Sequence, residues 1–292
     1  MTRQRSESRP RLSISTAVLA LALGGLGCTR PLQDLTPPAA SKQNAPTFAE
    51  TFPQGRIAGR VTWNGAAPDV PPIKGLISMS DGLRWGEMPN HMVPAIDPNT
   101  KGLADAVVFL KACDPKSAKP WPFEPLRIEI RDRKIGVAQG ARGGRVGFAR
   151  ICEPIEMVSR DDDRHMLRAR GAGFFTLPLP DPNKPKSRAI DAPGATEFTS
   201  AAGYFWSSAE VFTCEHPYYT TTDNEGRFSL ENVPPGQYAL IARHRNWKLL
   251  NSERDPETGK IMRLNFDVPF QTELAITVLQ SGTPDVTLTL PK

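Results

Sequence analysis

Alternation of apolar and polar residues, rather than any helical repeat, is the feature that most restricts the fold of this chain. It is cleanest in Leu126–Arg131 (LRIEIR) and Val286–Leu290 (VTLTL), where every second residue is apolar. Because successive side chains of a strand point to opposite faces, such runs are typical of half-buried strands. Beyond the N-terminal segment no long stretch has a 3.6-residue period, and 29 prolines disfavour long helices. The pattern predicts an all-β fold.

Turn-forming residues divide the alternating runs into short pieces. Clusters of Gly, Pro, Asn and Asp lie at residues 63–69, 95–102, 140–144, 222–227 and 233–238. Short strands separated in this way are typical of β-sandwiches and barrels rather than of strand–helix units. We predict two antiparallel Greek-key β-sandwich domains, residues 55–216 and 217–292. Whether the first strand, at residues 56–63, pairs with its sequence neighbours or with the C-terminal sandwich stays open.

The N-terminal segment has the pattern of an export signal. Four arginines in residues 1–11 precede the apolar run LSISTAVLALALGGLGC, as in the first two regions of a secretory signal. Residues 12–27 are too few to span a bilayer, which takes about 20. Leu26-Gly27-Cys28 resembles the end of a bacterial lipoprotein signal, which implies lipidation of Cys28, although Gly25 stands where such signals usually have leucine. Ordinary secretion and an uncleaved anchor are the alternatives.

This signal sets the expected location and charge of the mature chain. Residues 1–28 would be the signal ending at the lipidated Cys28, and residues 29–54, rich in Pro, Ala and Thr, a flexible tether. The protein would then be exported and held by its lipid on the periplasmic side of a bacterial membrane. Removing residues 1–27 removes four arginines and one glutamate, which lowers the formal charge from +5 to +2. A nearly balanced chain does not indicate nucleic-acid binding.

Three cysteines follow Cys28 in a chain that we expect to enter a disulfide-permissive compartment. They are Cys113, Cys152 and Cys214. The simplest expectation is one disulfide and one free thiol, and all three pairings stay open.

A double turn pattern lies between residues 221 and 240. Residues 224–226 (NEG) form a tight turn, after which Phe228 and Leu230 point inward, and PPG resets the chain for Tyr238 and Leu240. The spacing T-x-D-x-x-G-x-F-x-L followed by P-P-G-x-Y-x-L resembles the carboxypeptidase regulatory-like domain. The resemblance implies a small β-sandwich without peptidase chemistry, in a superfamily that also includes carbohydrate-binding domains.

The preceding region, residues 56–219, resembles the cupredoxin-like domains that some environmental bacteria fuse in front of this module. The strings GRVTWNG at 59–65 and AVVFL at 106–110 carry the resemblance. Relatives have a copper loop C-x-x-H-x-W-M, which we align on Trp206 and on the HPY of residues 216–218. Three ligand positions then hold Ala201, Tyr204 and Ser207, and His165 alone keeps a ligand. A blue-copper site needs two imidazoles and a thiolate, so the resemblance implies the fold without a functional copper site.

The string Cys214-Glu215-His216 suggests an alternative, a copper-binding electron-transfer protein with rearranged ligands from His91, His165, Cys214 and His216. Residues two apart in a strand share a face, but Pro217 indicates that the strand ends there. A buried or disulfide-bonded Cys214, a turn or surface His216 and a surface His91 explain the string without a metal. A cysteine nucleophile would also need an activating contact and an oxyanion donor. We therefore expect no cofactor and no enzymatic activity.

Aromatic residues are frequent near the expected domain junction. Most should be core residues, because aromatic side chains supply much of the buried area of small sandwiches. A third hypothesis is that some line a cleft between the domains and stack on a sugar. The candidates for such a cleft are Tyr204, Trp206, Tyr218, Tyr219 and Trp247.

Two further motifs have structural explanations. The string GARGGR at 140–145 has no phosphate-loop ending and predicts a hairpin turn with Arg142 and Arg145 exposed. His244 has basic neighbours that disfavour its protonated form. The sequence thus favours a non-enzymatic, membrane-anchored binding or structural module, with an envelope protein or polysaccharide as partner.

Overall fold

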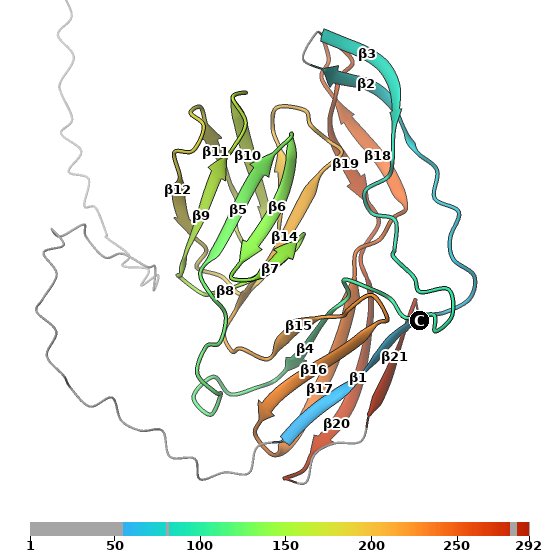
Figure 1. The fold of residues 1–292 in the computed structure, drawn as a ribbon, viewed down its shortest axis with the longest axis vertical. Coiled ribbons are helices and arrows are strands. Elements are labelled where there is room, and N and C mark those ends of the chain that lie inside the picture. Colours follow the sequence, from blue (N-terminus) through green and yellow to red (C-terminus); the bar gives the residue numbers. More distant parts are fainter. Residues whose placement is uncertain (1–54, 80–81, 281–284, 292) are drawn as a thin grey trace, which may run out of the picture. The chain divides into compact units, whose positions relative to one another are not determined.

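Every regular element of the described chain is a strand (Figure 1). The computed structural model describes residues 55–79, 82–280 and 285–291, so the predicted signal and tether lie outside the described residues. Within those ranges no helix is long and apolar enough to cross a bilayer. The prediction of an all-β sandwich fold is confirmed.

One sandwich, which we call the terminal sandwich, takes its strands from both ends of the described chain. Its two sheets have the orders β16-β1-β21 and β15-β4-β17-β20. The strands are β1 (Gly55–Trp63), β4 (Val107–Lys111), β15 (Tyr219–Thr221), β16 (Arg227–Val233), β17 (Gly236–His244), β20 (Phe270–Val278) and β21 (Val286–Leu290). Figure 1 shows the blue β1 between the orange β16 and the red β21. The first strand therefore pairs with the C-terminal sandwich, antiparallel to β16 and parallel to β21.

The second sandwich, which we call the inserted sandwich, uses one continuous stretch, residues 126–214. Its sheets have the orders β12-β9-β5-β6-β7 and β11-β10-β13-β14-β8. The strands are β5 (Leu126–Arg131), β6 (Lys134–Gln139), β7 (Arg142–Gly144), β8 (Val146–Arg150), β9 (Pro154–Ser159), β10 (His165–Gly171), β11 (Phe175–Leu179), β12 (Lys186–Ala189), β13 (Gly194–Ser200) and β14 (Ser208–Cys214). Its core is separate from that of the terminal sandwich.

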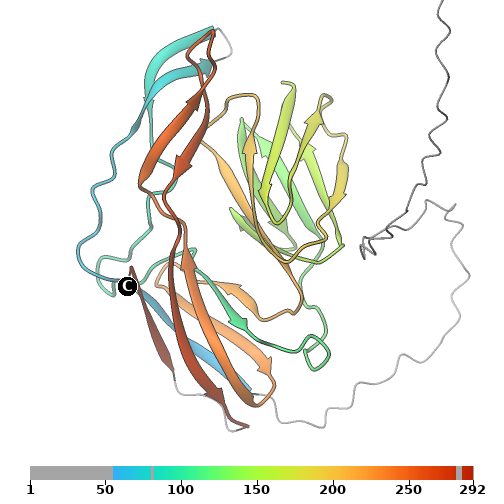
Figure 2. The same ribbon diagram turned by 180° about the vertical axis from the view of Figure 1, so that it is seen from behind.

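Two hairpins form a third, smaller unit. They are β2 (Ile73–Met79) with β3 (Gly82–Met88), and β18 (Leu249–Arg254) with β19 (Ile261–Phe266). Figures 1 and 2 show the cyan hairpin beside the orange-red one from opposite sides. Ile73 and Ile77 of the first hairpin share a small core with Ile261, Leu264 and Phe205.

The sheets do not divide after residue 216, where we expected one domain to end. β1 and β4 belong to the terminal sandwich, which the chain leaves after Lys111 and rejoins at Tyr219. The pairing is also not purely antiparallel, because β1–β21, β5–β9 and β8–β14 are parallel. An alternating pattern shows which face of a strand is buried but not which strand lies beside it, so the sequence could not identify the partners of β1.

The local patterns, in contrast, are confirmed. In β5 the apolar Leu126, Ile128 and Ile130 are buried, while Arg127 and Arg131 are exposed. The alternation therefore identifies the face that packs into the core.

The turn between β15 and β16 also forms as predicted. Asp223 Oδ1 accepts the N–H groups of Glu225 at 2.9 Å and of Arg227 at 2.8 Å. Gly226 has a φ of +76°, and a Cβ there would collide with the carbonyl oxygen of Val61. After the turn Phe228 and Leu230 are buried, as is Leu240 of β17.

Candidate functional site

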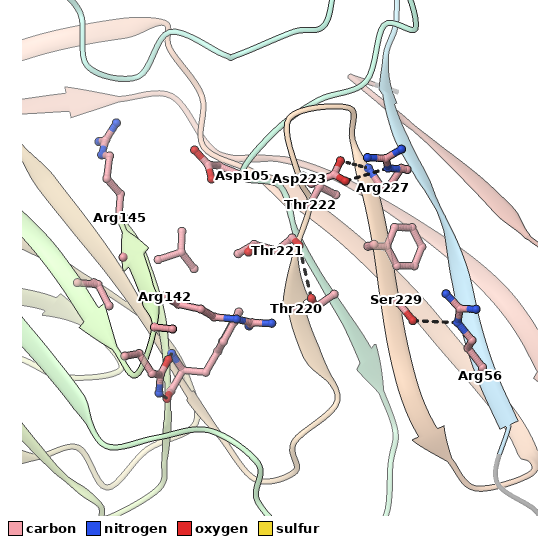
Figure 3. Close-up of a pocket in the computed structure, with 18 residues that line it drawn as sticks. Arg56, Asp105, Arg142, Arg145, Thr220, Thr221, Thr222, Asp223, Arg227 and Ser229 are labelled. Carbon is pink, nitrogen blue, oxygen red and sulfur yellow. Dashed lines mark hydrogen bonds and ion pairs between the residues drawn. The ribbon is translucent and has the colours of Figure 1, made fainter.

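A cleft of about 730 Å³ lies between the inserted and terminal sandwiches (Figure 3). One wall is the β6–β7 hairpin with the start of β8, and the other is β15, the turn after it and β16. Figure 3 shows Arg142 extending from the first wall toward Thr220 and Thr221 on the second. The volume falls within the range of about 300–1,000 Å³ typical of ligand sites.

The two walls of this cleft are edge strands. β7 is the last strand of its sheet, and β15 is the outer strand of the sheet in which it pairs with β4. In β15, Thr220 stands opposite Val108 and the flanking bonds join Tyr218 to Leu110 and Thr222 to Ala106. By the alternation of an antiparallel ladder, the backbone groups of Tyr219 and Thr221 point away from β4. The cleft thus lies along two strands with unpaired backbone edges.

The charges of the cleft are unevenly compensated. Arg227 pairs with Asp223 at 2.9 Å and with Glu225 at 2.6 Å, and Arg56 pairs with Glu231. Arg142 is exposed, and its side chain makes no hydrogen bond or ion pair with any described residue. This guanidinium is available to a ligand, and so is the exposed Asp105 carboxylate, which also lines the cleft and makes no ion pair with a described residue.

A smaller cavity of about 50 Å³ adjoins the cleft, and Asp105, Arg145 and Val146 line both. Behind this shared rim, Arg243 Nη1 of β17 donates to Glu210 Oε2 of β14 at 2.8 Å. Only 16% of the arginine side chain and 7% of the glutamate side chain are exposed. This ion pair joins the terminal sandwich to the inserted one.

Two further arginines meet at Ser208, the first residue of β14. Arg145 Nη2 and Arg245 Nη1 each donate to Ser208 Oγ at 3.2 Å, and Arg145 Nε donates to the Ser208 carbonyl oxygen at 3.1 Å. Neither guanidinium has a carboxylate oxygen of a described residue within 4.0 Å. Burial, reinforced by the Arg245 charge, lowers the pKa of Arg145 to about 9. Burial also lowers the pKa of Arg245.

His91 completes this group, with its Nε2 atom 3.2 Å from Ser208 Oγ. Burial lowers its pKa well below 6.5, and the charges of Arg145 and Arg245 lower it further, so the imidazole is neutral. Its Nδ1 atom is buried and has no hydrogen-bond partner among the described residues. A serine–histidine nucleophile needs an accessible hydroxyl and a group that orients the imidazole. Ser208 is 1% exposed, so this contact does not have the geometry of a nucleophile and its base.

Cys214 and His216 lie at the end of β14, beside an aromatic cluster. The Cys214 thiol lies 3.2 Å from the Phe212 carbonyl oxygen, and His216 Nδ1 accepts the Tyr218 N–H at 3.3 Å. Burial raises the pKa of the Cys214 thiol and lowers that of His216. His216 is in a turn, as expected, but it is buried rather than at the surface.

The other two candidate copper ligands are elsewhere. His165 of β10 contacts Asp161 Oδ2 at 3.0 Å, and His91 contacts Ser208 and is mostly buried, contrary to the surface position that we expected. No group of three or more His, Cys, Asp or Glu side chains within the described ranges is arranged to hold a metal ion. His91, His165, Cys214 and His216 therefore do not form one ligand group in the described part of the chain.

The five candidate cleft aromatics do not form one surface. Tyr218 is fully buried in the core of the terminal sandwich, and Tyr219 stacks on Phe109 with ring centres 5.0 Å apart. Trp247 packs against the terminal core, while Trp206 packs on the hairpin core beside Tyr204. None of the five lines the 730 Å³ cleft. The rings lie in three different packing regions, so they do not form one stacking surface.

The expected disulfide among the last three cysteines is also not formed. Cys113 and Cys214 are both free and buried, so neither is bonded to the other or to Cys152. Burial raises the pKa of the Cys113 thiol to about 11. Cys113 packs in the terminal core and Cys214 in the aromatic cluster, so the two thiols lie in different packing regions.

Sequence reasoning missed most of the charged groups at the junction. Arg142 is exposed as predicted, but Arg145, expected to be exposed with it, reaches into the junction. Ser208, Glu210 and Arg245 were not identified. The available signal was Glu210 itself, a lone carboxylate inside the otherwise uncharged strand β14, whose residues are all buried.

The comparisons with known proteins concern one part of the chain. Residues 213–263 match the family described as BOS complex subunit NOMO1-like, second beta sandwich domain. The matched segment begins at the end of β14 and runs through β15, β16, β17 and β18 into β19. A comparison with curated proteins gives no match. Over this segment the chain is similar to a β-sandwich domain, which fits a structural or binding module.

Proposed function

We propose that this protein is a non-enzymatic, cofactor-free binding module of the bacterial envelope, and that it binds an extended acidic segment of another protein in the cleft of Figure 3. The observation that carries the proposal is that edge strands β7 and β15 line this cleft together with the unpaired Arg142. An extended peptide can add a strand to a sheet edge, where main-chain hydrogen bonds supply affinity. The guanidinium of Arg142 would select acidic side chains and speed their association.

Two observations favour a protein partner over a polysaccharide. The sugar hypothesis depends on aromatic rings that line a cleft, and the five candidate rings lie outside the cleft of Figure 3. The family that matches residues 213–263 is described as part of a complex subunit, which supports a role in assembly.

Position-specific cross-linking tests this proposal. A photo-cross-linking amino acid replaces Thr221 of β15 in one variant and Ser187 of β12 in another. Ser187 is a matched control, because β12 is also an edge strand but lies at the opposite edge from β7 in their sheet. We expect a protease-sensitive adduct from position 221 alone, and its loss in the additional variant Arg142→Glu. Equal adducts from both positions, or a protease-resistant adduct, would contradict a protein segment in the cleft.

Membrane attachment through Cys28 is a separate part of the proposal. It is supported by the arginine-rich start, the short apolar run and the cysteine that ends it. Labelled fatty acid should be incorporated into the full chain and lost in Cys28→Ser, and this variant should leave the membrane fraction. Unchanged labelling of Cys28→Ser would refute the lipid anchor.

We also propose distant relationships for the two sandwiches. The carboxypeptidase regulatory-like assignment is supported for the terminal sandwich, because its turn pattern builds β15, β16 and β17. The cupredoxin-like assignment, without copper, concerns the inserted sandwich and rests on the alignment on Trp206 and on residues 216–218, with His165 at a ligand position. The strings at 59–65 and 106–110 give it no support, because they lie in and beside β1 and β4 of the other sandwich. A crystal structure of the inserted sandwich that superposes on no cupredoxin would remove this second assignment.

A further inference from the structure

The 50 Å³ cavity at the junction has more positive than negative charge in its wall. Arg145, Arg243 and Arg245 line it together with Glu210 and Asp105. Glu210 is engaged by Arg243 at 2.8 Å, and Asp105 is exposed at the rim shared with the cleft. The buried part of the wall therefore holds two guanidiniums, those of Arg145 and Arg245, without a counter-ion.

The hydrogen bonds at Ser208 also leave a donor without an acceptor. A serine hydroxyl has two lone pairs and one proton. Because Arg145 and Arg245 both donate to Ser208 Oγ, the lone pairs are used and the hydroxyl proton goes to His91 Nε2. The neutral imidazole then carries its own proton on Nδ1. This N–H is buried, finds no acceptor among the described residues, and belongs to a side chain in the cavity wall.

Two like charges at one buried oxygen are unfavourable. Removing a charged group from water costs several kcal/mol unless an opposite charge compensates it. The carboxylates nearest in effect to Arg145 and Arg245 are those of Asp105, Glu197 and Glu210. None of them lies within ion-pair distance, 4.0 Å, of either guanidinium. A small anion would supply both the negative charge that the two guanidiniums lack and the acceptor that the His91 Nδ1–H lacks.

We propose that this cavity binds one monovalent anion of the size of chloride between Arg145 and Arg245. A cavity needs about 10–15 Å³ to hold one water molecule, so a cavity of about 50 Å³ has room for a monatomic ion, whereas gluconate is a much larger anion. The anion would neutralise the charges of Arg145, in the segment before β8, and of Arg245, in the segment after β17. It would thereby hold the inserted sandwich against the terminal one, independently of the ligand proposed for the larger cleft.

Thermal unfolding of the full-length chain in detergent tests the site, with sodium chloride exchanged for sodium gluconate at constant ionic strength. A ligand that binds only the folded state should raise Tm by roughly 3 °C for each tenfold increase above its dissociation constant. We expect this dependence in the wild type and its loss in Arg145→Met and in Arg245→Met. Arg188→Met is the matched control, since Arg188 is exposed on edge strand β12, and it should keep the dependence. Equal Tm values in the two salts, or a dependence that survives in Arg245→Met, would overturn the proposal.

Bromide replaces chloride as a directly observable probe, and it does not depend on how the variants fold. Crystals of the wild-type chain grown with sodium bromide should give an anomalous peak between the Arg145 and Arg245 guanidiniums, near His91. Peaks confined to the exterior would mean an adventitious ion only, and would overturn the proposal.

Discussion

The two sandwiches bury similar cores but are assembled from the chain in opposite ways. The inserted sandwich uses the continuous residues 126–214, whereas the terminal sandwich joins β1 to β21, so that Thr62 and Thr289, 227 positions apart, share a hydrogen bond. Long-range pairing is slow, because loop entropy is lost before the contacts form. The inserted sandwich can therefore complete its core from local contacts, while the terminal one needs both ends of the chain.

The largest expected loss of stability comes from truncating a large buried side chain in one core at a time. Phe198 of the inserted core and Leu240 of the terminal core are both 0% exposed. Phe198→Ala should lower the free energy of unfolding by about 4 kcal/mol and Leu240→Ala by about 3 kcal/mol, since each leaves a cavity. Hydrogen exchange resolved by peptide should show increased exchange mainly in the sandwich that carries the substitution. A uniform increase across both sandwiches would mean that they unfold as a single unit.

The next effect concerns the contact between the sandwiches. Glu210→Gln keeps the shape of the side chain but leaves the mostly buried Arg243 without an opposite charge. Breaking such a pair typically costs about 3 kcal/mol. Chemical denaturation should show this loss, and a double-mutant cycle with Arg243→Met should give a coupling energy well above 1 kcal/mol. Additive effects would show that the pair does not join the two units.

Acid should weaken the junction through its buried histidines. Burial lowers the pKa of His91, His216 and His244, in the last case to about 4. Below about pH 6.5 the histidines of the unfolded chain bind protons, whereas the buried histidines of the folded chain do not. The folded state is therefore fully stable above that pH, and its free energy of unfolding declines as pH falls toward 4. The slope should reach about 1.4 kcal/mol per pH unit for each histidine.

Urea unfolding at pH 7 and pH 5 measures this slope, and His244→Gln provides the comparison. In this variant the free energy of unfolding should change less with pH, because one of the three buried histidines is gone. An unchanged slope would show that His244 does not contribute to the acid sensitivity.

The smallest effect is expected at the surface of the terminal sandwich. The Arg56 and Glu231 side chains pair at 2.9 Å but are 62% and 53% exposed. Glu231→Gln should change the free energy of unfolding by less than about 1 kcal/mol, because water and salt screen such pairs. It matches Glu210→Gln chemically, so the same denaturation experiment compares a buried pair with an exposed one. Equal losses of unfolding free energy in the two variants would show that burial does not determine how much an ion pair stabilises the fold.

The sequence predicted the features that depend on neighbouring residues. The alternation of Leu126, Ile128 and Ile130 identified a buried face, and the string around Asp223 and Gly226 identified a turn, because each needs only residues within a few positions. The pairing of β1 could not be predicted in the same way. Its partners β16 and β21 lie far along the chain, and several strands have compatible apolar faces.

The candidate site depended still more on distant contacts. Arg145 follows a glycine-rich hairpin and by itself indicates an exposed turn residue. It is held at the junction by Ser208 and by the carbonyl oxygen of His91, 63 and 54 positions away. Local sequence gives no information on such contacts, which arise only once the two sandwiches are assembled. The edge strands β7 and β15 likewise become a pair of walls only in three dimensions.

The place where the chain leaves the terminal sandwich has a consequence for how this architecture can vary. β4 and β15, the strands on either side of the insert, are hydrogen-bonded neighbours, with Phe109 opposite Tyr219. The whole inserted sandwich thus occupies the position of a hairpin loop. It can be treated as an exchangeable cassette, in which excision and closure by a few residues leave the host sheet uninterrupted, and in which another domain with adjacent termini can be grafted at the same point.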